Sequence, residues 1–337
     1  MINPQLKEKR NIIIEKKIAL GKASGKIILM GEHAVVYGEP AIALPFSAVE
    51  TIAEVKAEGE ALTVTCDFYD GLVHKMPEIL ESLKHAIRFS LYRIGAPQDP
   101  PIHIEIRSTI PAERGMGSSA AVAVAIARSL FNFYGKDLSD KELWEIVQSS
   151  EKIAHGNPSG IDTVTTSGTV PVFFVKDQPI EQLTIDMDAY LVVADTGQTG
   201  QTLKAIQSVK ELLKQEKNRF NAQLSIKELG ELSRLAKEAL LNNQAQELGE
   251  IMNEAHQLLA SLTVSNAALD RLSQVARQAG ALGAKLTGGG RGGCLIALAD
   301  SKKSAETIAV SLLENGARQT WCQYLGSVSR RQQGDKA

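Results

Sequence analysis

The sequence has few cysteines and no arrangement of them that suggests a disulfide framework. Cys66, Cys294 and Cys322 are the three cysteines in 337 residues, and no CxxC pair occurs. An odd, scattered set in a long chain favours a reducing compartment. We therefore expect a cytoplasmic protein.

Long apolar runs are absent as well. A helix that spans a bilayer needs about 20 consecutive, mostly apolar residues, and no segment approaches that length. The first residues, "MINPQLKEKRNIIIEKK", contain three consecutive isoleucines flanked by charged side chains, which is not the pattern of a signal peptide. We expect no association with a membrane.

An excess of charge of either sign is also missing. Lys plus Arg number 37 and Asp plus Glu number 39, so the formal net charge is -2. This balance argues against a nucleic-acid partner or a membrane surface, because neither electrostatic footprint is present. A small anionic substrate remains compatible, since a few local basic groups suffice to bind it. The composition, 44% hydrophobic and 23% charged, is that of a globular protein, and the length favours two domains.

The first half of the chain predicts strands followed by helices. We expect "KIALGKASGKIILMG" to form two strands separated by a Gly-Ser turn, and alternation continues through "AIALPFSAVETIAEVKA", "LTVTCDF" and "PPIHIEIRSTIP". Helices are predicted over 77–94, over 118–134 with Gly135 as the stop, and from the capping box at Ser139–Glu142 to about residue 154. After the loop "HGNPSGIDT" we expect a β-rich run, with Asp162 at the mouth of a strand.

The second half is dominated by helical patterns. A strand at "YLVVADT" precedes helices from 201 to 278, with interruptions predicted near 222–225 and 242–243. "AKLTGGGRGGCLIAL" reads as a strand, a glycine loop and a second strand, followed by a helix over 303–315 and a strand over 319–325. The order is α plus β without the regular alternation of a doubly wound sheet.

The stretch "IPAERGMGSSAA" places glycines and serines at a predicted helix start. Gly115 and Gly117 permit positive φ angles and a close approach of a ligand to the backbone. Free N–H groups and the positive end of the helix dipole meet at Ser118 and Ser119, a combination that binds phosphate. A capped helix after a tight turn explains this stretch equally well when it is taken alone.

A second glycine-rich stretch, "TGGGRGG", covers Thr287–Gly293. Five glycines in seven residues between two apolar strands cost backbone entropy, roughly 0.5–1 kcal/mol each. A hairpin tip needs only one or two glycines. The better explanation is that the backbone of this loop packs directly against a ligand, which leaves no room for side chains. Neither stretch matches the P-loop pattern G-x-x-x-x-G-K-[ST], and the protein-kinase motifs are absent.

Four charged residues stand where charge needs an explanation. Glu151 shares a helix face with Leu143 and Val147, so we expect it at the edge of the buried apolar stripe of that helix. There it would have a basic side chain or a metal ion as its partner, or else lie at the rim of the helix in contact with solvent. Asp162 is either a catalytic group or part of an Asx turn. Lys26 opens "IILMG", a strand too apolar to be exposed. Glu32 closes the same segment, and the neighbouring His33 fits a satisfied core histidine.

Four segments together carry a family resemblance. "ASGKIILMGEHAVVYG", "IPAERGMGSSAA", "EKIAHGNPSGIDT" and "KLTGGGRGGCLIAL" resemble, in order and spacing, the motifs of the superfamily named for galactokinase, homoserine kinase, mevalonate kinase and phosphomevalonate kinase, the GHMP kinases. The resemblance runs from Lys22 to about Leu298. It implies an α+β fold of two domains: residues 1–188, of the ribosomal-protein-S5-domain-2 type with a phosphate loop at 111–119, and residues 189–337, ferredoxin-like with a glycine loop at 287–293.

The resemblance also implies a role for each candidate residue. Asp162 and Lys26 would be catalytic, and Glu151 would hold Mg²⁺ together with Ser118, or with Ser119 as the alternative. The substrate would be bound by Glu32, His33, Ser159 and Thr202. The ATP phosphates would be bound by Arg114, Gly115, Met116, Gly117, Ser118, Ser119, Ala120, Gly289 and Gly290.

Within the family, "GEHAVVYG" with "HGNPSGID" is similar to the members that phosphorylate mevalonate, whereas galactokinases continue GEH with TDY. The implied reaction is transfer of phosphate from ATP to the C5 hydroxyl of mevalonate, and dimers are common in the family. The alternatives are a sister kinase for phosphomevalonate, homoserine or a sugar, or a non-catalytic nucleotide-binding relative. The sequence departs from the usual motifs at Ser24 (usually Pro), at Met116 (usually Leu) and at Arg291, which would contact a phosphate or point to solvent.

Overall fold

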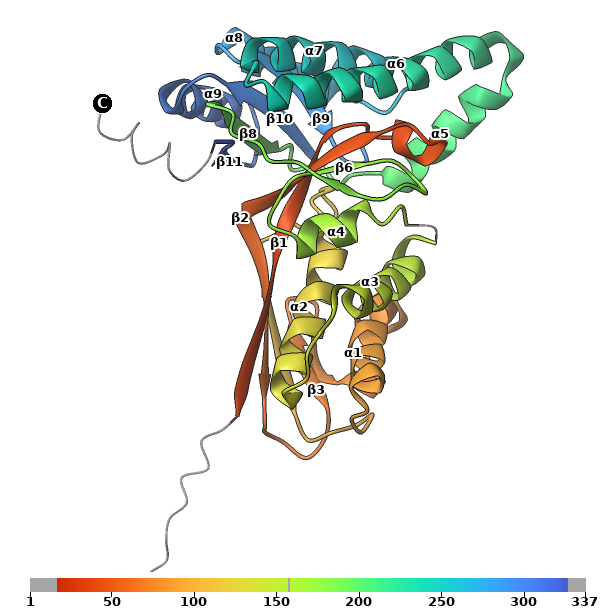
Figure 1. Ribbon diagram of the computed structural model, residues 1–337, viewed down its shortest axis with the longest axis vertical. Helices are drawn as coiled ribbons and strands as arrows, with labels where there is room; N and C mark the ends of the chain where they lie inside the picture. The colour runs from red at the N-terminus through yellow and green to blue at the C-terminus, as the bar shows by residue number, and fades with distance from the viewer. Residues whose placement is uncertain (1–16, 157, 327–337) are drawn as a thin grey trace, which may run out of the picture.

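The described part of the chain builds two β-sheets, each covered by helices (Figure 1). The computed structural model describes residues 17–156 and 158–326. A seven-stranded sheet uses strands between residues 18 and 182, and a four-stranded sheet uses strands between 190 and 324. We call the parts built on these sheets the N-terminal half and the C-terminal half. The predicted mixed α+β architecture is confirmed.

The N-terminal sheet is organised around one long strand. β2 (Ala41–Lys56) pairs along its length with β1 (Ile18–Met30), and its other edge pairs with β5 (His103–Ser108) and then β6 (Val172–Phe174). The turn predicted at Ser24–Gly25 is wrong. β1 is continuous there and contains a bulge, because its pairing with β2 resumes after a register shift. The sheet also contains β3 (Thr63–Cys66), β4 (Tyr69–Leu72) and β7 (Glu181–Gln182).

The long helices of this half lie where the sequence predicted them. α2 (Ser118–Tyr134) ends at Gly135, which has a left-handed conformation, and the N-cap Ser139 of α3 (Asp140–His155) accepts a bond from the Glu142 N–H. α2 packs closely against β1 because Gly21 has no side chain: a Cβ at Gly21 would lie 2.0 Å from the Ala125 carbonyl oxygen. The other helical segments are η1 (Ala34–Tyr37), η2 (Val73–Lys75), η3 (Glu78–Leu80) and α1 (Glu81–Ile94).

The strand expected directly after Asp162 is wrong. Residues Ile161–Ser167 form a short helix, α4, in spite of its three threonines. The hydroxyls of Thr165, Thr166 and Ser167 donate to carbonyls four residues back, at 2.6, 2.8 and 2.8 Å. These bonds satisfy polar groups that have little access to water, so the helix tolerates β-branched residues here.

The C-terminal half has the strand order of a ferredoxin-like fold. Its antiparallel sheet runs β11-β8-β10-β9, which in chain order is fourth, first, third, second. The strands are β8 (Tyr190–Asp195), β9 (Gly283–Thr287), β10 (Cys294–Ala299) and β11 (Gln319–Tyr324). The helices of this half are α5 (Thr202–Lys214), α6 (Glu216–Leu241), α7 (Ala245–Ser261), α8 (Ala267–Gln278) and α9 (Lys302–Glu314).

One of the two predicted helix interruptions is confirmed. α6 ends at Leu241, before Asn242 and Asn243, but it runs without a break through 222–225. Ala222 and Ser225 are buried in α6, and the Ser225 hydroxyl lies 3.4 Å from that of Ser261. Ala222, Gln223 and Leu224 are also strong helix formers, so local propensity and packing both favour a continuous helix here. The break lies instead at Gln215.

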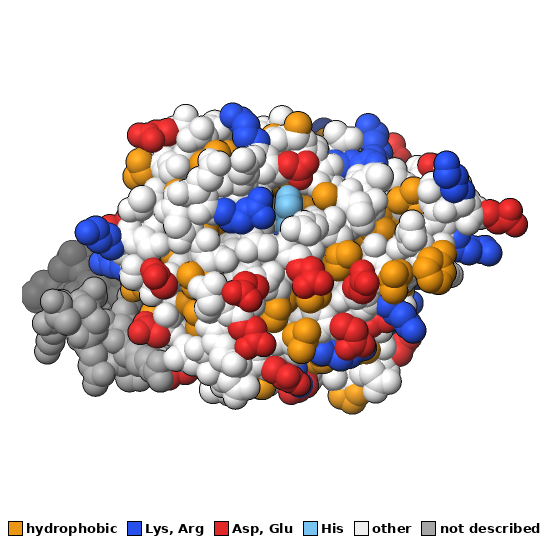
Figure 2. Space-filling model, turned by 90° about the horizontal axis from the view of Figure 1, so that it is seen from above, with side chains coloured by type: hydrophobic (Ala, Val, Ile, Leu, Met, Phe, Trp, Pro, Cys, Tyr) orange, Lys and Arg blue, Asp and Glu red, His pale blue; other side chains and the backbone are white. Residues whose placement is uncertain are grey.

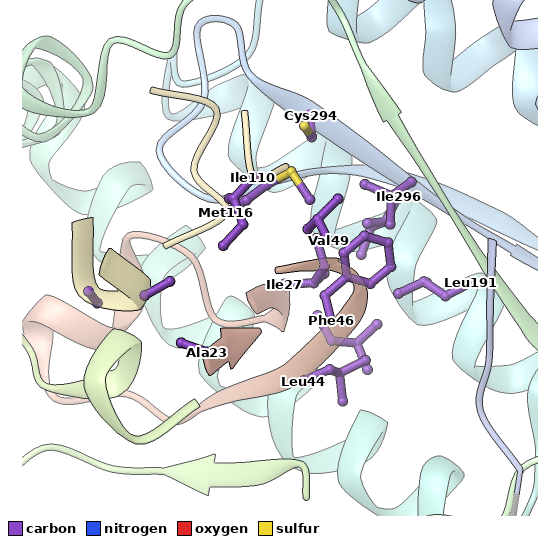
Figure 3. Close-up of a cluster of buried hydrophobic side chains, with 14 of the residues drawn as sticks. Ala23, Ile27, Leu44, Phe46, Val49, Ile110, Met116, Leu191, Cys294 and Ile296 are labelled. Atoms are coloured by element: carbon purple, nitrogen blue, oxygen red, sulfur yellow. The ribbon is translucent and has the colours of Figure 1, made fainter. Parts of the chain in front are cut away.

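The two halves share one hydrophobic core at their junction (Figure 3). Phe46 of β2 meets Trp321 of β11 edge to face, with ring centroids 6.5 Å apart. Met116 of the phosphate loop is 1% exposed and belongs to the same cluster as Leu191 and Ile296 of the C-terminal sheet. The phosphate loop is thus packed against both halves.

The face seen from above the C-terminal helices is mixed in character. Acidic side chains gather in a band across its lower middle, basic ones lie mostly toward its edges, and hydrophobic side chains are scattered (Figure 2). Across the described ranges, 17–156 and 158–326, no helix is both long enough and apolar enough to cross a membrane.

Candidate active site

A cleft of about 1300 Å³ lies between the two halves. The N-terminus of α2, the second half of β1, η1, α3, α4 and the N-terminus of α5 all contribute to its walls. The predicted site residues that line it are Lys26, Glu32, His33, Arg114, Gly115, Met116, Gly117, Ser118, Ser119, Glu151, Ser159, Asp162, Thr202 and Gly289.

The phosphate loop forms one wall through its backbone. Gly115 and Gly117 have φ angles of 77° and 74°, and Gly117 is the N-cap of α2. A Cβ at Gly117 would lie 2.7 Å from Cγ of Lys26, so only glycine lets the loop pass over that lysine. The Lys26 N–H donates to the Met116 carbonyl at 3.0 Å. Gly117, Ser118 and Ser119 line the cleft, which makes the free N–H groups at the start of α2 available to a ligand there.

The candidate catalytic pair meets beneath this loop. Nζ of Lys26 lies 3.0 Å from Oδ1 of Asp162, and their side chains are 6% and 32% exposed. Lys26 comes from β1 and Asp162 from the first turn of α4, with Gly160 as the N-cap. The pair presents a carboxylate oxygen and an ammonium group together at the cleft wall.

Glu151 has the features of a cation ligand. It is 2% exposed, and its Oε1 has no hydrogen-bond partner among the described residues. Burial raises the pKa of its carboxyl, and the nearby Asp162 raises it further, whereas a hydrogen bond from Ser119 lowers it. His155, whose Nε2 lies 3.7 Å from Oε2 of Glu151, also contacts the Ser119 hydroxyl at 3.3 Å. An orphaned carboxylate oxygen beside a hydroxyl fits Mg²⁺, which takes one or two protein oxygens and completes its shell with phosphates and water.

Glu32 and His33 line the cleft immediately before η1. His33 has a φ of 61° and its Nε2 donates to the Gly289 carbonyl at 3.1 Å. Burial lowers the pKa of His33 to about 4, so the ring is neutral at pH 7. The Glu32 carboxylate accepts a hydrogen bond from the ammonium of Lys285, a fully buried residue of β9.

The glycine loop closes the cleft from the C-terminal half. A Cβ at Gly289 would lie 1.9 Å from Oγ1 of Thr202, and one at Gly115 would lie 3.3 Å from Cα of Gly288. The excess of glycine thus brings two backbones together and seats Thr202 against the loop. Ser159 lines the cleft beside α4, where its hydroxyl accepts from the Ile161 N–H at 3.4 Å.

Some predicted residues lie elsewhere or are held by other partners. Ala120 is buried in α2, and Gly290 accepts a bond from the Gln201 N–H; neither lines the cleft. The Arg114 side chain is bonded to Asp195, which leaves its backbone as the part available to a phosphate. Arg291 turns away from the cleft and donates to the Thr263 carbonyl at 3.0 Å and the Ser208 hydroxyl at 2.9 Å.

Sequence reasoning missed three residues of the site. Lys285 stands in "GAKLTGG", a lysine inside an apolar strand, which is the signal that singled out Lys26. Asp195 ends the buried strand β8, and nothing in the sequence links it to Arg114. His155 follows Glu151 by four residues, a spacing that places both on one helix face.

Several apolar side chains from the β3–β4 connection, α1 and α2 line the cleft, and we call this part its apolar end: Cys66, Phe68, Leu83, Ala86 and Val122. Phe68 is 71% exposed, and it belongs to the connection between β3 and β4. Such a surface suits a flat aromatic ring more than a charged group.

The family model described as "GHMP kinases N terminal domain" matches residues 81–169, and "GHMP kinases C terminal" matches residues 236–318. The chain belongs to the GHMP kinase family. Mevalonate kinase from Pyrococcus horikoshii is 35% identical, over 88% of this chain and 93% of that protein.

Solved structures similar to this chain also include mevalonate kinases. Mevalonate kinase from methicillin-resistant Staphylococcus aureus MRSA252 is 34% identical with a TM-score of 0.71, over 92% of this chain and 100% of that one. The L. major mevalonate kinase, solved in complex with R-mevalonate, is 28% identical with a TM-score of 0.77, over 93% and 97% of the two chains.

Proposed function

We propose that this protein transfers the γ-phosphoryl group of ATP to the C5 hydroxyl of mevalonate, giving 5-phosphomevalonate and ADP. The observation that carries the proposal is the Lys26–Asp162 pair, 3.0 Å apart, in one cleft with the N-terminus of α2. The similarity to mevalonate kinases over nearly the whole chain supports mevalonate as the substrate.

The C5 oxygen of mevalonate bonds to the γ-phosphorus of ATP, and the bond between that phosphorus and the oxygen that leaves with ADP breaks. Asp162 takes the proton of the C5 hydroxyl in this step. The Lys26 ammonium beside Asp162 stabilises the developing alkoxide charge. The transition state of phosphoryl transfer is loose, so the proton leaves late. Positioning and charge neutralisation then contribute more than base strength.

The phosphate loop holds the nucleotide. The N–H groups at Gly117, Ser118 and Ser119 and the helix dipole of α2 bind the β- and γ-phosphates. The base lies in the apolar end of the cleft, against Phe68 and Leu83.

Glu151 and a serine of the phosphate loop hold Mg²⁺, which neutralises phosphate charge when bound. His155 Nε2 lies close to both the Ser119 hydroxyl and the Glu151 carboxylate, and this shared neighbour favours Ser119 as the hydroxyl ligand over Ser118. Glu32, His33, Ser159 and Thr202 surround the substrate.

We divide the chain into domains at 188/189, between β7 and β8.

A coupled assay of ADP release tests the function. Purified protein is supplied with ATP, Mg²⁺ and, in turn, mevalonate, phosphomevalonate, homoserine and galactose. We expect mevalonate to give the highest kcat/KM by orders of magnitude. Turnover of another of these alcohols without turnover of mevalonate would refute the proposal, and turnover of none of them would indicate a non-catalytic relative.

A further inference from the structure

Lys285 is a buried charge that the reaction described above does not use. Its side chain is 0% exposed, and among the described lysines only Lys26 is also buried. Its ammonium donates to the Glu32 carboxylate and, at 2.8 Å, to the Leu286 carbonyl. Removing two charges from water is costly, and a pair of apolar residues often stabilises a core better. Stability alone therefore does not account for this pair.

The geometry of Glu32 indicates what the pair does. One carboxylate oxygen, Oε1, is bonded to Lys285, whereas Oε2 is buried and has no partner among the described residues. Glu32 lines the cleft, and Lys285 lies behind it in β9. A buried acceptor left without a donor costs free energy. The cleft is the side from which a ligand can supply that donor.

The charges around Glu32 set its protonation state. Burial raises the pKa of its carboxyl, and Lys285 from β9 opposes this most, with a smaller contribution from Lys26 of β1. His33, beside it on the same loop, is neutral because burial lowers its pKa to about 4. Without Lys285, burial would favour the protonated carboxyl, which donates where the carboxylate accepts.

We propose that Lys285 is a positioning residue for the alcohol substrate. It fixes one oxygen of Glu32 so that the other accepts a hydrogen bond from the hydroxyl of mevalonate that does not react. The reacting hydroxyl gives its proton to Asp162, so Glu32 takes the tertiary hydroxyl at C3. Since Glu32 and Lys285 belong to different halves, this contact forms only when the halves are held together. The inference rests on the proposed function.

The test crosses a Lys285→Met variant with a substrate analogue that lacks the C3 hydroxyl, 5-hydroxy-3-methylpentanoate. With mevalonate we expect KM to rise roughly 10- to 100-fold, the range for losing a hydrogen bond to a charged group. The affinity for a fluorescent ATP analogue should stay within about threefold. With the deoxy substrate, wild type and variant should differ little. Lys303→Met, at an exposed position of α9, is the matched control.

The pH profile separates positioning from a purely structural role. In Lys285→Met, the acid limb of kcat/KM should move to higher pH, with activity recovering as Glu32 ionises. Lys285→Arg, which keeps the charge, should move the limb back. If the single variant does not fold, Glu32→Gln/Lys285→Met removes both charges together and should fold, bind mevalonate weakly and show no acid limb from Glu32.

Two outcomes would overturn the inference with the proposed function intact. One is a folded Lys285→Met enzyme that keeps the wild-type preference for mevalonate over the deoxy substrate and the wild-type acid limb. The other is a double variant that binds mevalonate as tightly as wild type. If the wild-type enzyme itself does not turn over mevalonate, both the proposed function and the inference are wrong.

Discussion

The guanidinium of Arg114 in the phosphate loop is bonded to the Asp195 carboxylate at the end of β8. Nε of Arg114 lies 2.9 Å from Oδ1, and the two side chains are 10% and 4% exposed. The same guanidinium donates to the Gly197 carbonyl at 3.2 Å, and the Gly200 N–H donates to the Glu113 carbonyl at 2.9 Å. These bonds tie the phosphate loop of one half to the sheet of the other.

We predict that Asp195→Ala destabilises the protein and misplaces the phosphate loop. The variant leaves Arg114 as an unpaired, nearly buried charge, which lowers the free energy of unfolding by about 3–5 kcal/mol. A loop displaced by about 1 Å would lower kcat/KM for ATP by roughly 10- to 100-fold. Urea unfolding and steady-state kinetics with varied ATP measure the two effects.

The double variant Arg114→Met/Asp195→Ala is the control for this prediction. It removes both charges, so we expect it to recover much of the lost stability while kcat/KM for ATP stays low. If it is as unstable as the sum of the single variants, the two side chains do not act as a pair.

A second prediction concerns the reacting hydroxyl. Asp162→Asn keeps the shape of the side chain but cannot accept the proton as a carboxylate, so kcat should fall by about 10²–10⁴. Binding of ATP, measured by fluorescence of an analogue, should be retained. Asp177→Asn, on an exposed loop where Asp177 has a φ of 60° that Asn tolerates, is the matched control. An equal loss of ATP affinity and turnover would show that Asp162 has a different role.

The parts of the fold that local rules determine were predictable from the sequence. The start and end of α2 follow from Gly117 and Gly135, and α3 follows from its capping box at Ser139. α4 was not predictable, because a run of β-branched threonines favours a strand until the hydroxyl bonds of a buried site are known. The continuity of α6 through residues 222–225 was predictable, because Ala222, Gln223 and Leu224 are strong helix formers.

The candidate site shows the same division. The sequence indicated Lys26 and Asp162 separately, each with an alternative explanation, and only the fold brings them to 3.0 Å. Lys285 carried the same signal as Lys26 but lies 253 residues from its partner Glu32. Nothing local predicts a pairing at that separation, so partners across the two halves stay hidden until the sheets are placed.

A third prediction concerns Mg²⁺. Glu151→Gln removes the carboxylate whose Oε1 lacks a partner among the residues described in the structure. The Mg²⁺ concentration for half-maximal rate should then rise roughly 10- to 100-fold, while binding of ATP without metal changes little. Glu254→Gln, at an exposed position of α7, serves as the control. An unchanged Mg²⁺ requirement would assign Glu151 a structural role.

The last prediction is a pH dependence of stability that comes from His33. Burial lowers its pKa from 6.5 to about 4, so between these values the folded protein binds fewer protons than the unfolded chain. The free energy of unfolding is therefore not reduced by His33 above pH 6.5. It decreases as the pH falls from 6.5 toward 4, because the unfolded chain binds a proton that the folded protein does not. Between pH 7 and pH 5 this amounts to about 2 kcal/mol.

His33→Gln isolates this contribution, because glutamine does not titrate and its amide can still donate toward the Gly289 carbonyl. Burial also lowers the pKa of His256, but that residue is present in both proteins and cancels in the comparison. We expect wild type to lose about 2 kcal/mol more than the variant between pH 7 and pH 5, measured by urea unfolding at each pH. Parallel pH profiles for the two proteins would mean that the His33 ring takes up protons in the folded state as readily as in the unfolded chain.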